Sequence, residues 1–357
     1  MRSLFRMSFG RSFGLALIAA IVSVISVKAE TPPSVIRLAG PGNAAGQPYG
    51  TNVLGVVRAR KVLEEEFKAD GVKIEWQFPR GTGPAINEAF ANGQVDFAAY
   101  GSLPSIVGRG AGLRTKAIAS YGVSPVYVVA RKDAPITTIA DLKDKKISLQ
   151  RGTIFEWSLN RILSTTSLKE RDLQIFDLQT ADQVSAFTSG HIDAIVGNNT
   201  ILDLVDRDFG KVIYSTKGTR NPGTSFGVFA VSEDFAKKYP ETTQRVATAF
   251  IRSARFASDD ANRNELYDIW ALTGTPRTAF VKDYDKDDLR ERLNPLLDEY
   301  FVSSVKDGVD FTLNAKLVRR GFKPEDWIDR SYIDKAIKQL GYEGFWSAYD
   351  ANGKPAS

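Results

Sequence analysis

Two stretches of this sequence repeat the same short pattern. FANGQVDFAAYGS, which begins at Phe90, and FTSGHIDAIVGNN, which begins at Phe187, share Phe, Gly, a β-branched residue and Asp at positions 97 residues apart. In both copies a Gly that suits a helix end precedes a brief apolar strand, of the kind that is buried in a parallel sheet. The order strand, loop, helix, strand, helix, strand can be traced around each copy, which predicts two similar α/β lobes.

The expected fold class is therefore α/β, with two lobes that contain open, mostly parallel sheets and are joined by a hinge of two strands. A length of 357 residues is enough for two such lobes. The chain is expected to cross near residues 124–131 and to return near 224–231, which makes the first lobe discontinuous. The expected domains are a signal peptide at 1–29, the first part of lobe one at 30–125, lobe two at 126–224, and at 225–357 the return to lobe one with a helical C-terminal extension packed on it.

The N-terminus has the composition of an export signal. Three arginines precede the apolar run FGLALIAAIVSVISV, and small residues follow at the spacing of a cleavage site. The run of 15 apolar residues is short for a membrane span, although an uncleaved anchor is the alternative. Loss of residues 1–29 lowers the basic residues from 47 to 43, against 42 acidic residues, so the mature chain carries about one net positive charge. No basic patch indicates nucleic-acid binding.

The chain contains no cysteine. This excludes a disulfide framework, thiol catalysis and the lipidated Cys that anchors a secreted bacterial protein. The mature protein is expected to be a free monomer in the periplasm.

Polar and Gly-rich segments follow several predicted strands. In open α/β sheets, ligands lie beyond the carboxyl ends of the strands. Such segments are GPGNAAGQPYGT, PRGTGP, QRGT and the tails YGSLPS and GNNT. Gly permits a close approach of the backbone to a ligand, and a helix start presents N–H groups with a partial positive charge. Pro84 suits the first position of such a helix, because its missing N–H is not needed there. The segments therefore predict a cleft that binds an oxyanion.

Each of these residues also has a plain structural alternative. Gly93 and Gly190 are expected to end helices, and Asp96 and Asp193 to be structural. The Gly and Thr residues of RGTG and RGT suit turns and caps, and the arginines before them suit a solvated surface. A ligand site is favoured because the segments recur at the same end of two facing lobes.

The phrases ADLKDKKISLQRGT, FTSGHIDAIVG and ANGQVDFAAYGSLPS resemble type II periplasmic binding proteins of ABC importers, in the branch that binds aliphatic sulfonates, taurine and nitrate. The resemblance covers roughly Val35 to Arg255. It implies ligand contacts around 43–49, at 81–83, at 101–103 and at 152–156. The ligand-binding residues expected from the segments and from the resemblance together are Asn43, Tyr49, Arg80, Gly81, Thr82, Gly83, Gly101, Ser102, Leu103, Arg151, Gly152, Thr153, Phe155, Glu156, Asn198 and Asn199.

The resemblance implies a periplasmic solute-binding component of an ABC importer. Such a protein captures a small organic anion, here an aliphatic sulfonate, and delivers it to an inner-membrane permease served by a separate ATPase, without a cofactor or metal. One departure leaves the substrate open. Where the family often has Trp, or Asp with Pro, this chain reads GNNT at 197–200, and two asparagines cannot meet an amine by charge.

Two alternatives remain. One is a binder of an aromatic carboxylate or a thiamine-precursor pyrimidine, with Tyr49, Tyr100, Phe155 and Trp157 as ring-stacking candidates, although aromatic residues at such spacing usually belong to the core. The other is an enzyme on the same fold. The single histidine, His191, is expected at the end of its strand opposite the ligand, no GxxxxGK[ST] loop is present, and a desulfinase of this general fold uses a cysteine that this chain lacks.

Overall fold

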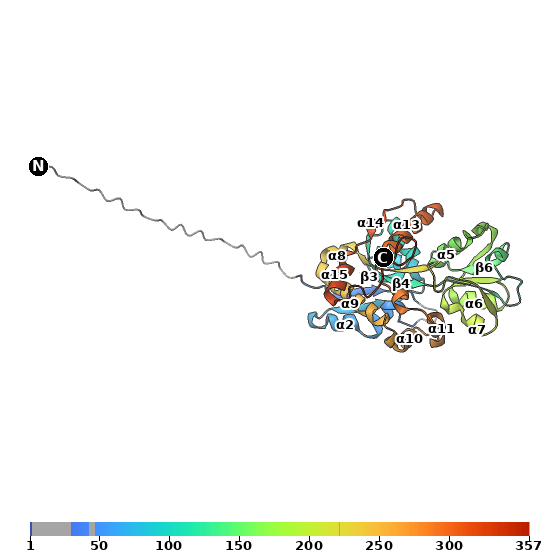
Figure 1. The fold of residues 1–357 in the computed structure, drawn as a ribbon, viewed down its shortest axis with the longest axis horizontal. Helices are drawn as coiled ribbons and strands as arrows, with labels where there is room; N and C mark the ends of the chain where they lie inside the picture. The colour runs from blue at the N-terminus through green and yellow to red at the C-terminus, as the bar shows by residue number, and fades with distance from the viewer. Residues whose placement is uncertain (2–29, 43–46, 221, 357) are drawn as a thin grey trace. The chain divides into compact units, whose positions relative to one another are not determined.

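The computed structural model of the protein describes Met1 and residues 30–42, 47–220 and 222–356. The expected signal peptide, apart from Met1, and the expected ligand contact Asn43 lie outside these residues. Residues Thr31–Ser357 form one compact unit, which carries all the helices and strands described below (Figure 1).

The first five-stranded sheet, sheet one, has the strand order β2-β1-β3-β10-β4. Two of its three inner strands, FAAYG and SFGVFAVS, are apolar and almost entirely buried, as expected for strands covered on both faces. The strands are β1 (Val35–Ala39), β2 (Lys73–Gln77), β3 (Phe97–Gly101), β4 (Thr115–Ser124) and β10 (Ser225–Ser232).

The second five-stranded sheet, sheet two, has the order β7-β6-β8-β5-β9. Its edge strand β9 was not predicted from the sequence, although its residues Val212, Ile213 and Tyr214 favour a strand. The strands are β5 (Tyr127–Arg131), β6 (Lys146–Leu149), β7 (Gln174–Asp177), β8 (Ala194–Gly197) and β9 (Gly210–Ser215).

Each sheet has four strands that run in one direction, as expected of a mostly parallel sheet, and one strand, β10 or β5, that runs in the opposite direction. The strand β1 pairs in parallel with β2 and β3, and β6 pairs in parallel with β7 and β8. The pairings of β10 with β3 and β4, and of β5 with β8 and β9, are antiparallel. The strands β5 and β10 are those with which the chain enters one sheet directly from the other, and they run against their neighbours.

The chain passes between the sheets twice. It leaves β4 at Ser124 and enters β5 at Tyr127. It leaves β9 at Ser215 and enters β10 at Ser225. Two connections close together in space are what a hinge between two lobes requires.

Helices cover the sheets and form most of the chain after β10. The helices used below are α3 (Thr82–Ala91), α4 (Ser102–Gly110), α5 (Ile154–Leu163), α6 (Thr180–Thr188), α7 (Asp203–Asp206), α9 (Pro240–Ala257), α11 (Arg277–Tyr284), α12 (Leu289–Arg292), α13 (Glu299–Asn314), α15 (Ser331–Leu340) and the 3-10 turn η4 (Asn199–Ile201). The others are α1 (Asn52–Ala59), α2 (Val62–Glu66), α8 (Glu233–Lys238), α10 (Arg263–Ala271), α14 (Pro324–Trp327) and the 3-10 turns η1 (Lys68–Asp70), η2 (Ile139–Leu142), η3 (Glu170–Asp172) and η5 (Asp260–Asn262).

Both copies of the repeated pattern form the same connection between a helix and a strand. Gly93 and Gly190 follow α3 and α6 with positive φ angles of 63° and 79°, which end the helices. Asp96 and Asp193 each accept a hydrogen bond of 2.8 Å from a backbone N–H of the neighbouring parallel strand. The structural roles predicted for these four residues are confirmed.

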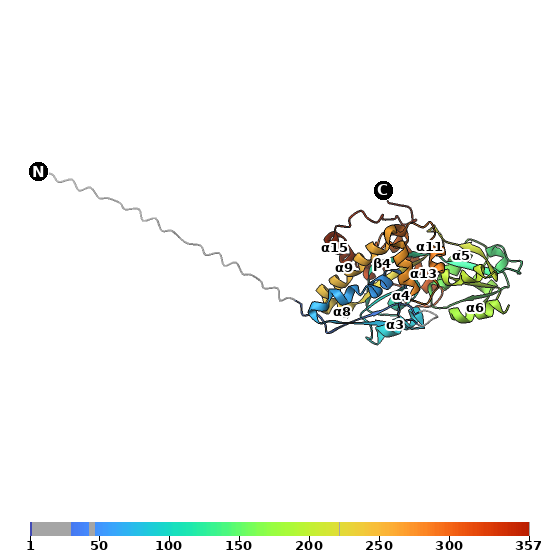
Figure 2. The same ribbon diagram turned by 90° about the horizontal axis from the view of Figure 1, so that it is seen from below.

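The C-terminal helices contact both sheets. The helices α9 and α15 pack against β4 of sheet one, as expected of an extension on lobe one. In addition, α11 lies against η4, the turn that follows β8 of sheet two. Figure 2 shows α4 beside both α13 and α5. The extension is therefore in contact with parts of both lobes.

Trp157 of α5 connects the two lobes by packing. Its side chain is buried in the core of sheet one, although α5 follows a strand of sheet two. Its ring centroid lies 5.8 Å from that of Phe226 and 6.3 Å from that of Phe311. Trp157 is thus a core residue rather than a ring-stacking ligand contact.

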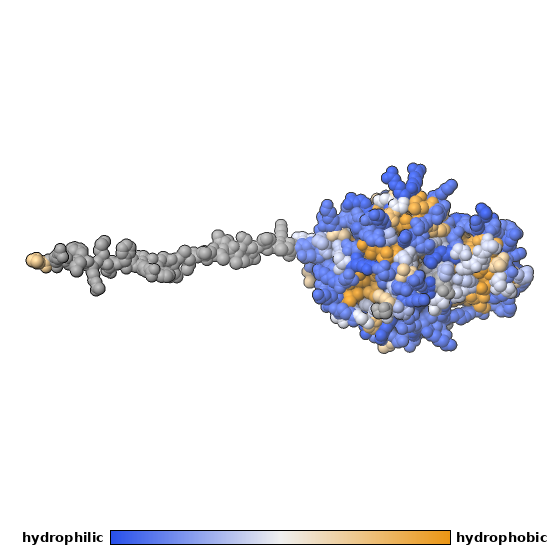
Figure 3. Space-filling view, turned by 45° about the horizontal axis from the view of Figure 1, so that its top comes forward, coloured by the Kyte–Doolittle hydropathy of each residue, from blue (hydrophilic) through white to orange (hydrophobic). Residues whose placement is uncertain are grey.

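The face of the molecule shown in Figure 3 is mainly hydrophilic, with smaller apolar areas. Among the described residues, no helix has both the length and the apolar character that a membrane crossing requires.

Candidate functional site

The loops at the carboxyl ends of β2 and β6 meet each other. Gln150, directly after β6, donates a hydrogen bond of 3.3 Å from its side-chain amide to Thr82 Oγ1 at the start of α3. A Cβ on Gly152 would lie 3.2 Å from Pro84 Cγ, and one on Gly101 would lie 3.8 Å from Ile154 Cβ. The structure therefore brings the predicted RGTGP, QRGT and YGS segments together where the two lobes touch.

The start of α3 has a constrained backbone. Thr82 is its first residue and has a φ of 52°, in the left-handed region that is uncommon for a residue other than Gly. Pro84 was expected at the first helical position but is the third helical residue. Strained backbone of this kind is concentrated at functional sites. Gly81 precedes the helix and is exposed.

Gly83 has a structural role at this helix. A Cβ there would lie 2.3 Å from Pro104 Cγ of α4, so any side chain would force the two helices apart. The glycine was predicted to let the backbone approach a ligand. The structure instead shows that Gly83 lets α3 approach α4.

Ser102 is the first residue of α4 and follows β3 directly. It is fully buried, and its Oγ has no hydrogen-bond partner among the described residues. Leaving a buried hydroxyl unpaired costs about 1–3 kcal/mol, and such groups are rare in native proteins. The hydroxyl and the free N–H groups of the first helical turn are therefore suited to a partner outside the chain. Leu103, next to it, is a core residue.

Arg151 is held by carboxylates of its own lobe. Its Nη1 lies 2.5 Å from Glu156 Oε1, and its Nη2 contacts Glu170. Burial lowers the pKa of Arg151, but the hydrogen bonds and charges of Glu170 and Glu156 outweigh burial, and the net pKa is raised. Its guanidinium is thus bound within lobe two, and we do not retain Arg151 as a ligand-binding group.

Glu156 and Thr153 hold the start of α5. Glu156 is buried, and its Oε2 accepts a hydrogen bond of 2.9 Å from the backbone N–H of Gly152. Thr153 Oγ1 accepts from the N–H of Phe155 at 3.3 Å and donates to the carbonyl of Gln150 at 2.6 Å. Phe155 is half-buried and packs against the core of sheet two. The helix start therefore already carries a carboxylate, which opposes a second anion there.

The remaining candidates are Asn198, Asn199, Arg80 and Tyr49. Asn198 caps η4, its Oδ1 accepting from the N–H and Oγ1 of Thr200 at 3.1 and 2.8 Å, and Asn199 is buried. Arg80 is exposed. Tyr49 is half-buried, with the Arg58 guanidinium 5.7 Å from its ring centroid.

Sequence reasoning missed several polar residues near these loops. Gln150 bridges Thr82 and Gln179, whose Oε1 it contacts at 3.0 Å, yet it was not selected from the QRGT segment. Its position directly after β6 was the signal that could have found it. Ser148 of β6 and Ser158 of α5 are also buried, and their hydroxyls have no partner among the described residues. Serines within an apolar strand or helix gave no local sign of this.

A surface hollow lies elsewhere on the molecule. It has a volume of about 740 Å³ and lies in the C-terminal helical region. Two of the arginines that line it already form ion pairs, Arg263 with Asp260 at 2.6 Å and Arg277 with Asp268 at 2.7 Å. Size alone does not make it a site for an anion.

No group of three or more His, Asp or Glu side chains suited to a metal ion occurs within the part of the chain that the structure describes. His191 is exposed, and its Nδ1 lies 2.8 Å from Ser189 Oγ, in the turn that precedes β8.

Comparison with known proteins gives a consistent result. The sequence model described as NMT1/THI5 like matches residues 66–263, more than half of the chain. A Bacillus subtilis protein named as an aliphatic sulfonates-binding protein is 24% identical over 293 residues, which are 80% of this chain and 84% of that protein. An Escherichia coli protein with the same name is 31% identical over 179 residues, 48% of this chain and 52% of that protein. A solved structure titled as a periplasmic sulfonate-binding protein SsuA of Methylobacillus flagellatus is 29% identical, with a TM-score of 0.80, and the superposition covers 90% of this chain and 99% of that one.

Proposed function

Because the chain belongs to the NMT1/THI5-like family, we propose that it is the periplasmic solute-binding component of an ABC importer. It captures a small organic anion, an aliphatic sulfonate, between its two lobes and presents it to an inner-membrane permease with a separate ATPase. The names of the relatives from Bacillus subtilis, Escherichia coli and Methylobacillus flagellatus support the sulfonate. The protein is a binder and not an enzyme, and it needs no cofactor.

The observation that carries the proposal is the Ser102 hydroxyl. It is buried and has no partner among the described residues, and it stands at the first residue of the nine-residue helix α4. The preceding residue, Gly101, lies against Ile154 of α5, on the facing lobe. A helix start and a hydroxyl together stabilise an oxyanion without a full counter-charge, since hydrogen bonds to a charged acceptor are stronger than neutral ones.

The second contributor on lobe one is the start of α3. It lies opposite the QRGT segment, to which Thr82 is joined through Gln150. Two starts on one lobe suit the oxygens of a sulfonate, while the α5 start is filled by Glu156. The charge recognition is therefore assigned to lobe one, and Gln150 and Asn199 of lobe two are assigned neutral contacts.

The lobes and the location follow from the same proposal. Residues 30–125 and 225–357 form lobe one, and residues 126–224 form lobe two. Residues 1–29 are a signal peptide that is cleaved on export, and the mature protein is a periplasmic monomer without a lipid anchor.

Isothermal titration calorimetry tests the ligand class. The panel consists of ethanesulfonate, taurine, nitrate, benzoate, an aminopyrimidine and diethyl sulfone, the last being a neutral analogue. We expect ethanesulfonate to bind and the sulfone not to bind. Sulfone binding as tight as that of the sulfonate would refute recognition by charge, and tighter binding of benzoate or of the pyrimidine would favour an aromatic ligand. Chemical turnover of any compound would indicate an enzyme.

The Ser102→Ala variant tests the site, with Ser105→Ala as its matched control. Ser105 is in the same helix and is equally buried, but its Oγ donates to the carbonyl of Ser102 at 2.7 Å. Loss of the Ser102 hydroxyl should weaken sulfonate binding about ten- to hundredfold, as for a hydrogen bond to a charged group, without lowering the melting temperature. Ser105→Ala should lower stability by about 1 kcal/mol and leave affinity unchanged. The reverse pattern would remove Ser102 from the site.

A further inference from the structure

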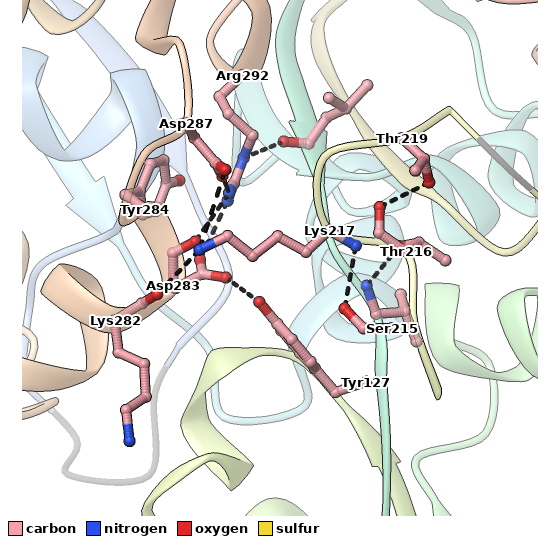
Figure 4. A network of polar contacts seen from close by, with 12 residues as sticks. Tyr127, Ser215, Thr216, Lys217, Thr219, Lys282, Asp283, Tyr284, Asp287 and Arg292 are labelled. Carbon is pink, nitrogen blue, oxygen red and sulfur yellow. Dashed lines mark hydrogen bonds and ion pairs between the residues drawn. The ribbon is translucent and has the colours of Figure 1, made fainter. Parts of the chain in front are cut away.

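The C-terminal segment 277–292 contacts both passages of the chain between the sheets. This segment comprises α11, α12 and the residues between them. Figure 4 shows its polar contacts with Tyr127 at the start of β5 and with Lys217, which follows β9. The two passages form the hinge between the lobes, so contacts at these places can influence the angle between the lobes.

At the first passage, a buried ionic cluster joins the two sheets. Arg292 Nη2 lies 3.1 Å from Asp283 Oδ2, and Arg292 Nε donates to the carbonyl of Val123 of β4 at 3.3 Å. The other carboxylate oxygen of Asp283 accepts a hydrogen bond of 2.6 Å from the hydroxyl of Tyr127. Asp283 thus connects an arginine bound to sheet one with a tyrosine of sheet two.

The backbone of β4 is adapted to this contact. Gly122 has a φ of 97°, and a Cβ there would lie 2.0 Å from the carbonyl oxygen of Arg292. Only Gly permits so close an approach in this conformation. The segment 277–292 is therefore fixed against sheet one, and Tyr127 is the group that binds it to the other lobe.

At the second passage, Lys217 continues the cluster. Its Nζ donates to the carbonyl of Lys282 at 3.0 Å and lies 3.9 Å from Asp287, which also pairs with Arg292. Lys282 in turn forms an ion pair with Asp206 of α7 in lobe two. The segment 277–292 therefore makes polar contacts with Tyr127, Lys217 and Asp206 of lobe two, in addition to the packing of α11 against η4.

Tyr127 is suited to act as a permanent donor. Burial and then the neighbouring Asp283 carboxylate raise the pKa of its phenol, so the hydroxyl remains protonated at neutral pH. A buried ion pair is weak evidence for added stability, because the cost of desolvating its charges offsets their attraction. A hydrogen bond of this kind is sensitive to the relative position of its two partners.

We propose that Tyr127 and Asp283 are positioning residues, which hold the two lobes in the arrangement where Gln150 touches Thr82 and so set ligand affinity from outside the cleft. The ligand class in this inference rests on the proposed function, whereas the contacts that hold the lobes do not depend on it. When only a fraction of the protein molecules has the arrangement that binds ligand, the apparent affinity is reduced in proportion to that fraction. Loss of the hydroxyl should therefore weaken binding even though it does not touch the ligand.

The test compares Tyr127→Phe with Tyr342→Phe in the whole mature chain. Tyr342 is half-buried and packs beside Trp346 against the sheet-one core. We expect Tyr127→Phe to bind ethanesulfonate about tenfold more weakly, equivalent to roughly 1.4 kcal/mol, with the change in the dissociation rate rather than in the association rate. Tyr342→Phe should leave both rates unchanged. A Tyr127→Phe variant with wild-type affinity and dissociation rate would overturn the inference.

A second measurement needs no ligand. Because the chain has no cysteine, Glu88→Cys on α3 and Asp182→Cys on α6, both exposed, place one spin label on each lobe. Electron paramagnetic resonance then gives the distance between the labels. Tyr127→Phe should lengthen and broaden this distance distribution in the ligand-free protein, whereas Tyr342→Phe should not. An unchanged distribution would overturn the positioning role even if the sulfonate binds, and a changed one would support it even if the ligand is of another class.

Discussion

The two copies of the repeated pattern differ in how they end. Up to the Asp they are built alike, with a helix that stops at Gly and a carboxylate that accepts a backbone N–H of the next strand. The first copy then runs into α4, whose first residue Ser102 has an unpaired buried hydroxyl. The second copy ends in the short turn η4, which Asn198 caps and which lies against α11.

The residues that the two copies share have a structural role, whereas the residues that follow them differ between the lobes. The shared residues make the connection between helix and strand, which both lobes need. The residues that follow are free to differ because they lie beyond the sheet. In the proposed site lobe one presents donors with them, whereas in lobe two they contact the C-terminal extension. The two copies also differ in burial, which allows matched substitutions to compare them.

The largest difference is expected at the shared Phe. Phe187 is buried in the core of sheet two, whereas Phe90 is only partly buried beside Tyr100. Phe187→Ala should lower the free energy of unfolding by about 3–5 kcal/mol, and Phe90→Ala by less. Urea unfolding followed by circular dichroism measures both. Equal losses would show that the two copies are energetically equivalent despite their different burial.

A smaller difference is expected at the shared Asp. Asp96 is buried, accepts from the Arg37 N–H and lies 3.3 Å from Arg37 Nε. Asp193 is half-buried, and within the described part of the chain its side chain accepts one hydrogen bond, from the Lys146 N–H. Asp96→Ala should cost about 1.5–3 kcal/mol, since a hydrogen bond to a charged group is lost in a buried place, and Asp193→Ala should cost less. The same unfolding experiment decides, and a greater loss for Asp193→Ala would contradict the comparison.

The smallest effect concerns pH and compares one carboxylate from each lobe. Hydrogen bonds from the N–H groups of Thr137 and Thr138 lower the pKa of Asp141 to about 2, and burial raises the pKa of Asp96. Asp141 therefore stabilises the fold above its unfolded pKa, and this contribution is lost as the pH falls toward about 2. The contribution of Asp96 depends on pH in the opposite direction. The folded state favours the protonated form of Asp96, so the folded state loses relative stability as the pH rises.

Melting temperatures between about pH 2 and pH 6 test this pair. The melting temperature of the wild type should exceed that of Asp141→Asn by less as the pH falls. Its difference from the melting temperature of Asp96→Asn should shift in favour of the wild type as the pH falls. Parallel curves for the wild type and Asp141→Asn would show that the hydrogen bonds of Asp141 do not lower its pKa.

The sequence alone determined the elements that depend on local chemistry. Gly93 and Gly190 end helices because a positive φ costs Gly little, and the apolar runs after them form buried strands because they have no polar side chain to solvate. The repeat and the Gly-rich loops were therefore sufficient to predict two α/β lobes, the two passages between them, and three of the loops that meet where the lobes touch, RGTGP, QRGT and YGS.

Only the tertiary structure decided which side chains are available there. Glu170 binds Arg151 from 19 positions away, Thr82 meets Gln150 from 68 positions away, and Asp283 meets Tyr127 from 156 positions away. Trp157 likewise enters the core of the opposite lobe. No local pattern contains these pairings, because they depend on how distant segments pack, and packing determines whether a charge is already neutralised or a hydroxyl is left without a partner.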